Sequence, residues 1–236
     1  MEKIAAIIVA GGSGKRMGTA IKKQFIKLRS KEILAYTLEA FNKVEEISEI
    51  IVVVGEDDLE KVKKDIVEQY GISKVSQIVV GGKERQDSVY NGLLATSDDI
   101  EYVMIHDGAR PFVSEEVILR AIEKTKACKA TIVAVPVKDT IKVIDIEAGT
   151  VEQTPPREKL WAVQTPQSFD KKLLVDAYAF AHEKGLQVTD DSMIVEAYGK
   201  KVQVVLGDYN NIKITTPEDL VIGESILGKN KIGKRN

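Results

Sequence analysis

The sequence contains only one cysteine and two histidines among its 236 residues, and this scarcity excludes several kinds of site. Cys128 alone cannot form an intramolecular disulfide or a cysteine-based zinc site. His106 and His182 are too few for a histidine-rich metal centre. The formal net charge is −2, so the chain lacks the basic character of a nucleic-acid-binding protein, and we expect no nucleic-acid partner.

Long apolar runs are absent as well. No stretch approaches the roughly 20 residues that a transmembrane helix needs. The N-terminal apolar run, residues 4–10, is short and follows Glu2 and Lys3, which is not typical of a signal peptide. The chain is 44% hydrophobic and 30% charged, an ordinary balance for a globular protein. We therefore expect a cytoplasmic protein without membrane contacts.

Buried strands and amphipathic helices alternate through most of the chain. Thr216 and Pro217 are typical of a helix start, and they predict a helix that runs to about residues 227–228. The alternation predicts an α/β fold, with a Rossmann-like, mostly parallel open sheet and helices on both faces. The length fits one large domain or two small ones, and we expect a single domain over residues 1–236. Apolar, mostly β-branched runs predict strands at residues 4–10, 50–54, 77–80, 102–105 and 131–135.

The first strand ends in a glycine-rich loop with clustered cations. Glycine lets the backbone turn sharply and approach a ligand closely, and the N–H groups freed in such a turn suit an anion. A tight connection flanked by solvated lysines would leave a similar pattern, but four cations in one short segment favour a phosphate site. The loop residues are Ala10, Gly11, Gly12, Ser13 and Gly14, and the cations are Lys15, Arg16, Lys22 and Lys23.

Two better-known phosphate loops fit this segment poorly. A Walker A loop needs Gly-x-x-x-x-Gly-Lys followed by Ser or Thr, but Arg16 follows Lys15 and Val9 stands where the first glycine belongs. The dinucleotide fingerprint places a third glycine where this chain has Met17. Its acidic partner does exist, because Glu56 follows the second strand. A P-loop NTPase is therefore disfavoured, and a dehydrogenase is disfavoured more weakly.

Polar segments follow four of the expected strands, after Ala10, Val80, Ile105 and Val135. In open α/β sheets, ligands bind at the carboxyl ends of the strands. We therefore expect these four loops to form one site.

The pattern changes over about residues 138–160. Residues 139–145 alternate with period two, Gly149 marks a turn and residues 150–153 fit a returning strand. This predicts a protruding β-hairpin arm, and residues 160–167 read as part of the same arm region. A lone hairpin is marginally stable in water, so we expect the arm to pack on another subunit.

Together these segments resemble the 2-C-methyl-D-erythritol 4-phosphate cytidylyltransferase family of the non-mevalonate isoprenoid pathway. The similarity covers essentially the whole chain, and it is the order of the motifs that makes it specific. The matching motifs lie at residues 10–18, 23–25, 81–89, 106–111, 139–142, 164–167, 189–191 and 211–215.

The resemblance implies a nucleotidyltransferase in which the substrate phosphate attacks the α-phosphorus of CTP in line and releases pyrophosphate. Such transfers need positioning and charge neutralisation more than covalent help. By resemblance, Arg16 and Lys23 are catalytic and stabilise charge in the transition state. The nucleophile is already an anion and needs no general base, so His106 is expected to have a structural role.

The resemblance also implies the residues that contact the two substrates. For CTP they are Ala10, Gly11, Gly12, Ser13, Gly14, Lys15, Gly81, Gly82, Ser88 and Asp107. For methylerythritol phosphate they are Asp107, Arg110, Thr140, Arg157, Thr165 and Lys213. Arg157 and Thr165 belong to the arm region by this reading. A plain helix start at residues 85–88 and a structural ion pair of Arg110 are the alternatives that the residues alone leave open.

A divalent cation and a second copy of the chain complete the expected assembly. By resemblance, Mg²⁺ is held mainly by the CTP phosphates, with Asp107 as a possible ligand. The arm of the family crosses to its partner, which implies a homodimer with shared sites. Ribitol-5-phosphate cytidylyltransferase remains an alternative with the same loops, and a non-catalytic nucleotide-binding module is a more distant one.

Overall fold

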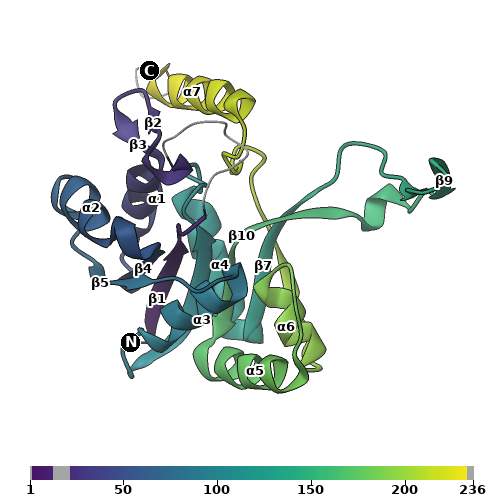
Figure 1. Ribbon diagram of the computed structural model, residues 1–236, viewed down its shortest axis with the longest axis horizontal. Coiled ribbons are helices and arrows are strands. Elements are labelled where there is room, and N and C mark those ends of the chain that lie inside the picture. Colours follow the sequence, from purple (N-terminus) through teal and green to yellow (C-terminus); the bar gives the residue numbers. More distant parts are fainter. Residues whose placement is uncertain (1, 13–21, 233–236) are drawn as a thin grey trace.

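The computed structural model describes residues 2–12 and 22–232, and it centres on one seven-stranded sheet (Figure 1). The strand order is β11-β7-β10-β6-β1-β4-β5. Strand β10 is antiparallel to both neighbours, and the other pairs are parallel, so the expected mostly parallel sheet is confirmed. The strands are β1 (Lys3–Val9), β4 (Ile47–Val54), β5 (Val75–Val80), β6 (Ile100–Asp107), β7 (Ala130–Pro136), β10 (Trp161–Asp170) and β11 (Gln203–Leu206).

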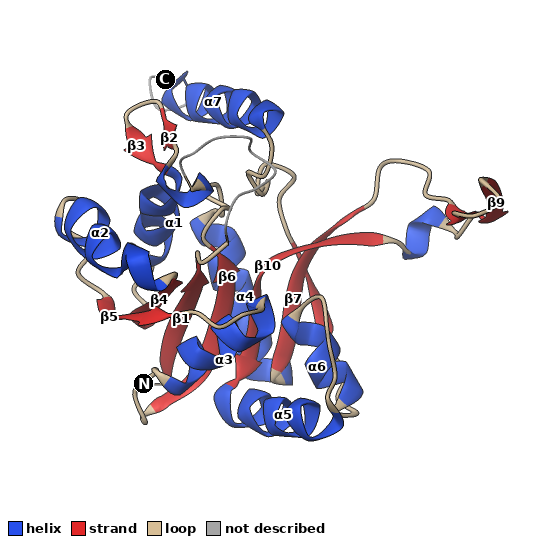
Figure 2. Ribbon diagram, in the orientation of Figure 1, coloured by secondary structure: helices blue, strands red, loops and turns tan. Residues whose placement is uncertain are grey.

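Helices cover both faces of this sheet, as the alternation predicts (Figure 2). One face carries α1 (Ile33–Asn42), α2 (Leu59–Val62) and α4 (Glu115–Cys128), and the other carries α3 (Arg85–Leu94), α5 (Lys171–Lys184) and α6 (Asp191–Ala197). The helical segment after β4 consists of three pieces, η3 (Glu56–Asp58), α2 and the π-helical η4 (Lys63–Glu68).

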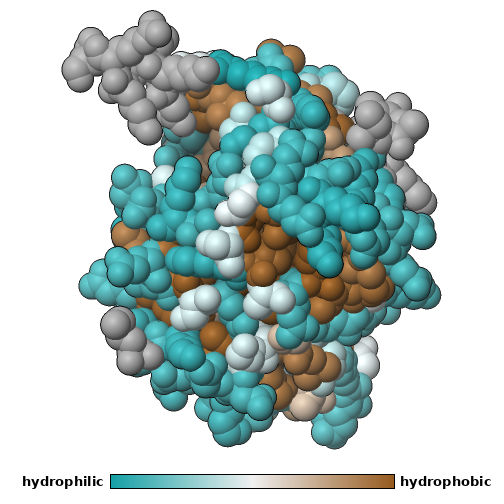
Figure 3. All heavy atoms as spheres, turned by 90° about the vertical axis from the view of Figure 1, so that its left-hand side faces the viewer, coloured by the Kyte–Doolittle hydropathy of each residue, from teal (hydrophilic) through white to brown (hydrophobic). Residues whose placement is uncertain are grey.

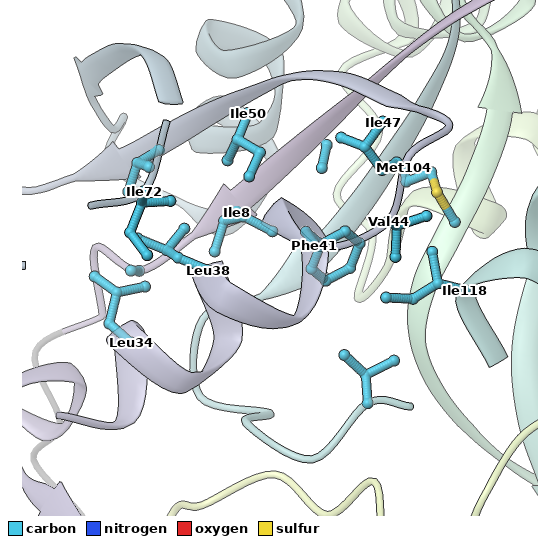
Figure 4. Close-up of a cluster of buried hydrophobic side chains, with 14 of the residues drawn as sticks. Ile8, Leu34, Leu38, Phe41, Val44, Ile47, Ile50, Ile72, Met104 and Ile118 are labelled. Atoms are coloured by element: carbon cyan, nitrogen blue, oxygen red, sulfur yellow. The ribbon is translucent and has the colours of Figure 1, made fainter. Parts of the chain in front are cut away.

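The two faces of β1 show why its sequence is apolar throughout. Side chains alternate across a strand, so Ile8 packs with α1 while Ile7 packs on the side of α3. Leu38 and Phe41 of α1 lie close to Ile8 in the core, and all three are fully buried (Figure 4). Burying one such side chain stabilises the fold by roughly 1.5–3 kcal/mol. A strand covered on both sides therefore needs an unbroken apolar run.

The C-terminal helix α7 (Pro217–Ile232) starts where the sequence predicts it. Asp219 Oδ2 accepts from the backbone N–H groups of Thr215 and Thr216 at 2.8 and 2.9 Å and so caps the helix start. The helix runs past its predicted end near residues 227–228, because Gly228 lies inside it. It packs near the small β2–β3 pair. The short elements there are η2 (Lys23–Phe25), β2 (Lys27–Leu28) and β3 (Lys31–Glu32).

The predicted arm is present as a two-stranded hairpin that projects far from the body (Figure 1). It contains β8 (Val143–Asp145) and β9 (Thr150–Gln153), followed by η5 (Arg157–Lys159). The assignment of residues 160–167 to the arm region is wrong for most of that segment. Strand β10 begins at Trp161 and enters the sheet between β6 and β7. Thr165 therefore belongs to the core.

The outer surface is mainly hydrophilic on the side of α2 and β5, with apolar areas between the polar side chains (Figure 3). No helix in the part of the chain that the structure describes is long and apolar enough to cross a membrane.

Candidate active site

A cleft of about 200 Å³ opens at the carboxyl ends of β1, β5 and β6. Its walls come from residues 10–12 after β1, from residues 82–85 after β5, and from Asp107 and Ala109 at the end of β6, and Lys213 joins them from the segment before α7. Three of the four loops that the sequence brings to one sheet edge therefore meet. The fourth loop, after β7, leads into the arm. Of the predicted residues, those that line the cleft are Ala10, Gly11, Gly12, Gly82, Ser88, Asp107 and Lys213.

The phosphate segment is only partly within the described residues. Ser13, Gly14, Lys15 and Arg16 lie outside them, as does the side chain of Lys23. Lys22, one of the four clustered cations, is paired with the buried Asp58, with 2.7 Å between Nζ and Oδ2. This ion pair joins the residue before η2 to the end of η3, so Lys22 is partly neutralised rather than fully available to a ligand.

The second wall is a tight turn held by Ser88. Its Oγ accepts from Gly82 N at 3.1 Å and donates to Glu84 O at 3.0 Å. A Cβ on Gly82 would lie 2.2 Å from Cβ of Asp87, so only glycine fits there. Gly81 precedes this turn, and α3 begins directly after it with a reciprocal cap between Glu84 and Asp87. Ser88 thus shapes the turn as well as lining the cleft.

Asp107 lies at the floor of the cleft and is surrounded by three cations. Its Oδ2 is 2.7 Å from Nζ of Lys213 and 3.6 Å from Nε of Arg110, and its Oδ1 is 3.5 Å from Nε of Arg85. Burial alone would raise the pKa of Asp107, but the cations, led by Lys213 and Arg85, hold it well below its usual range. Asp107 and Asp191, the second carboxylate partner of Arg85, place two negative charges against the three cations, so the cluster keeps a net positive charge, which favours anionic ligands.

Arg85 is the site residue that the sequence reading did not single out. Its Nη1 donates to Oδ2 of Asp191 at 2.8 Å, and the Tyr178 hydroxyl donates to Oδ1 of the same carboxylate at 2.9 Å. Burial alone would lower the pKa of Arg85, but Asp191 and Asp107 raise it above its ordinary value. Its position directly after the Gly81–Gly82 turn was the available signal. No local pattern indicated that its buried partner would be Asp191 on α6.

His106 and Thr165 lie beneath Asp107. The Thr165 hydroxyl accepts from Asp107 N at 3.1 Å and lies 3.0 Å from Nδ1 of His106, while Nε2 of His106 lies 3.1 Å from Arg110 O. These partners require Thr165 to donate to Nδ1, so the proton of the neutral ring is on Nε2. Burial lowers the pKa of His106 to about 4. The ring is therefore neutral at physiological pH, and its role here is structural, as the sequence reading expects.

Two of the remaining predicted residues, Thr140 and Arg157, lie apart from the cleft of their own chain. Thr140 and Arg157 are exposed at the base of the arm and in η5, and Arg157 donates to Lys138 O at 3.0 Å. Arg110 is held by Asn211 O at 2.9 Å beside Asp107. Among the described residues, no group of three or more histidine, cysteine, aspartate or glutamate side chains could hold a metal ion.

Comparison with known proteins gives one consistent family. A family model described as 2-C-methyl-D-erythritol 4-phosphate cytidylyltransferase (IspD) matches residues 4–229. Proteins with that name from Alkaliphilus oremlandii and Clostridium botulinum strain Okra are 49% and 52% identical to this chain. The alignments cover 99% and 97% of this chain, and 99% of each relative.

Solved structures agree with the sequence comparison. The 4-diphosphocytidyl-2C-methyl-D-erythritol synthase of Anaerococcus prevotii superposes with a TM-score of 0.84 at 40% identity, covering 96% of this chain and 99% of that one. The 2-C-methyl-D-erythritol 4-phosphate cytidylyltransferase of Thermus thermophilus gives 0.78 at 32% identity, covering 96% and 98%. With fold, motifs and near-complete coverage in agreement, the chain belongs to the 2-C-methyl-D-erythritol 4-phosphate cytidylyltransferase family.

Proposed function

We propose that this chain joins CTP to 2-C-methyl-D-erythritol 4-phosphate and releases 4-diphosphocytidyl-2-C-methyl-D-erythritol and pyrophosphate. Family membership supports the reaction class. The structural observation that carries the proposal is the positive cluster around Asp107, beside the glycine loop at the carboxyl ends of the strands. Two anionic substrates must approach each other in this reaction, and their repulsion is part of the barrier.

The cluster presents positive charge to the incoming phosphate, and each of its cations is already paired with a carboxylate. Before substrate binds, Asp107 partly neutralises Lys213, Arg85 and Arg110 and holds them in place. The Lys213 side chain is 35% exposed, so its ammonium remains accessible to a ligand. Preorganised charge of this kind stabilises a transition state without reorganisation at the moment of reaction. We assign Lys213 and Arg110 to the acceptor phosphate, and Asp107 to their orientation and to the ribose.

The glycine loop and its cations complete the nucleotide side of the proposal. Gly11 and Gly12 follow β1, where backbone N–H groups suit phosphate oxygens, whereas Ala10 N already donates to Val53 O at 2.8 Å and Ala10 lines the cleft beside them. We assign Ser13, Gly14 and Lys15 to the same role, and Arg16 and Lys23 to stabilising the pentacoordinate phosphorus. The turn with Gly81, Gly82 and Ser88 forms the opposite wall and is assigned to the cytosine and ribose.

Attack by a phosphate oxygen requires no deprotonated side chain. The substrate phosphate is anionic at neutral pH, so the enzyme has only to align it with the α-phosphorus. His106 fits this view, because its two ring nitrogens are both occupied and the ring is fully buried. The chain's own contribution is orientation and charge.

We include Mg²⁺ in the proposal as an ion carried by the nucleotide. The described cleft contains only two carboxylates, Glu84 and Asp107, and three cations already surround Asp107. These residues fit an ion that keeps its waters and binds phosphate oxygens, and they make Asp107 a poor direct ligand in this arrangement. When bound, the ion would neutralise charge on the triphosphate.

The arm supports a homodimer in which each chain completes the site of its partner. Ile144 and Val151 are cross-strand neighbours in the hairpin, and both are substantially exposed. Ile146 at the turn is 92% exposed. A two-stranded hairpin with apolar side chains on its surface gains stability by packing on another protein surface. We assign Thr140 and Arg157 to the acceptor site of the partner, because they belong to the arm segment and are not among the residues that line the cleft of their own chain.

Pyrophosphate release tests the reaction and its acceptor. The enzyme is given CTP and Mg²⁺ with methylerythritol phosphate in one tube and ribitol 5-phosphate in the other. Turnover in the first tube alone is the expected result. Turnover in the second tube alone would identify the protein as a ribitol-5-phosphate cytidylyltransferase. No turnover in either tube, with CTP still bound, would favour a non-catalytic nucleotide-binding module.

A further inference from the structure

Gln24 is a buried polar residue in the wall of the cleft. It lies in η2, between Lys23 and Phe25, and only 1% of it is exposed. Phe25 packs into the main core beside α1 and α2, and Ile26 O accepts from Ile33 N at 2.9 Å. These contacts fix the backbone on both sides of Gln24. Its side chain is therefore held at the cleft by the fold rather than by hydrogen bonds of its own.

Neither polar atom of the Gln24 amide has a hydrogen-bond partner in the described structure. A buried amide left unpaired costs about 1–3 kcal/mol, and most buried polar side chains in native proteins are paired. The two other buried glutamines follow that rule. Gln164 donates to Asp208 O and Gln167 donates to Asp190 Oδ2, each at 2.8 Å. Gln24 is thus the exception among the buried glutamines that the structure describes.

A side chain needed only for packing would be apolar at this position. Methionine has nearly the same length and fills irregular space without a polar group. The amide therefore indicates a partner that is absent from the free chain. Its place in the cleft wall, next to Ala10, Gly11 and Gly12, puts that partner within the space where the proposed nucleotide phosphates bind.

We propose that Gln24 is a nucleotide-binding residue whose Nε2 group donates to a phosphate oxygen of CTP. The inference rests on the proposed function and adds a residue to it. Phosphate oxygens only accept hydrogen bonds, so Nε2 is the matching group, and Oε1 remains free for an ordered water. The cytosine is assigned to the opposite wall, which argues against a contact between Gln24 and the base. The neutral amide adds a directed bond without adding charge beside Lys23.

The test compares the intact protein with Gln24→Met in binding and in stability. Affinity for CTP, pyrophosphate and cytidine is measured by calorimetry without the second substrate, and the melting temperature is measured without ligand. Loss of a hydrogen bond to a charged group predicts roughly 10- to 100-fold weaker binding of CTP and of pyrophosphate. Cytidine binding is expected to stay unchanged. The melting temperature of the free variant is expected to equal or exceed that of the wild type, because an unpaired amide has been removed.

Gln167→Met is the matched control. Gln167 is equally buried, but its Oε1 accepts from Asp191 N and Ser192 N at 3.0 and 3.1 Å. This control is expected to melt at a lower temperature than the wild type, which is the opposite sign from Gln24→Met.

Three outcomes would overturn the role of Gln24. They are unchanged CTP affinity in Gln24→Met, an equal loss of cytidine binding, or a fall in melting temperature as large as that of the control. A wild type that binds pyrophosphate but not CTP would instead overturn the cytidylyl assignment. The role of Gln24 at the phosphates would then be judged from pyrophosphate alone.

Discussion

Arg85 and Asp191 form a 2.8 Å ion pair between Nη1 and Oδ2 that links the first residue of α3 to the first residue of α6. The Asp191 side chain is 1% exposed, whereas that of Arg85 is 30% exposed and also faces Asp107 in the cleft. The pair therefore connects the ligand-facing cluster to the buried packing of α5 and α6. The buried Asp191 holds Arg85 in place, and Arg85 in turn helps to hold Asp107.

Replacing Arg85 with methionine is expected to destabilise the protein by about 3–5 kcal/mol, because it leaves the buried carboxylate of Asp191 without its cation. Urea unfolding at pH 7 measures this loss. The double variant Arg85→Met with Asp191→Asn removes both charges and is expected to recover part of it. Losses that simply add in the double variant would show that the two residues are not coupled.

Lys23→Ala is expected to keep the fold and lose turnover on the order of a hundredfold or more, as is typical when a charge-stabilising group is removed. Pyrophosphate release gives the rate, and the melting temperature checks the fold. Lys27→Ala is the matched control. Lys27 lies on the nearby β2, where its Nζ is 3.3 Å from Oε1 of Glu32, and it does not line the cleft. Near-wild-type activity in Lys23→Ala would remove Lys23 from the mechanism.

The buried His106 predicts a specific dependence of stability on pH. Burial lowers its pKa from 6.5 to about 4, so the unfolded chain binds a proton that the folded chain does not bind between these values. Its contribution is fully present above pH 6.5 and is lost as the pH falls toward 4, by about 3 kcal/mol in all. Unfolding free energies of wild type and His106→Gln are compared across this range. The slope of unfolding free energy against pH should be shallower in the variant, by an amount that corresponds to at most one proton. Parallel curves for the two proteins would contradict the lowered pKa of His106.

The arm predicts the oligomeric state. Ile144→Asp with Val151→Asp places two charges on the exposed apolar pair of the hairpin, and we expect the dimer to dissociate in sedimentation velocity experiments. Glu152→Gln, on the neighbouring position of β9, is the control and should remain dimeric. A wild type that sediments as a monomer at micromolar concentration would refute the dimer directly.

Sharing of the site can be tested separately by mixing. Arg157→Ala and Lys213→Ala are each expected to have little activity, since each lacks one acceptor contact. If the two residues come from different chains, a mixed dimer keeps one intact site, and random exchange restores about a quarter of the sites. Activity that does not recover after subunit exchange would place both residues in the same chain's site.

The sequence was sufficient wherever local chemistry decides the structure. Apolar runs buried on both faces identified β1, β4 and β6, because a strand covered by helices on two sides has no polar position. Turn and cap residues located the start of α7 and the hairpin of the arm. The glycine-rich segment after β1 could be predicted as a phosphate site because glycine and lysine have properties that do not depend on distant residues, and this stays a prediction.

Strand β10 marks the limit of that reasoning. Its middle contains Gln164, Thr165 and Gln167, which the sequence reading assigned to the arm region, yet all three are buried. Each is paired with a residue from a distant segment, such as Asp208, His106 or Asp190. Most buried polar side chains have a hydrogen-bond partner, and the sequence does not state which partners the fold will bring.

The sequence by itself determined the family, the alternation of strands and helices, and the loops that carry the chemistry, since these follow from side chains and their near neighbours. Only the tertiary structure decided that Arg85 joins Asp107 to Asp191, that Thr165 supports the cleft from within the sheet, and that Gln24 is buried at the cleft without a partner. These are relations between distant segments, and their energies arise from burial and charge pairing that exist only after the chain has folded.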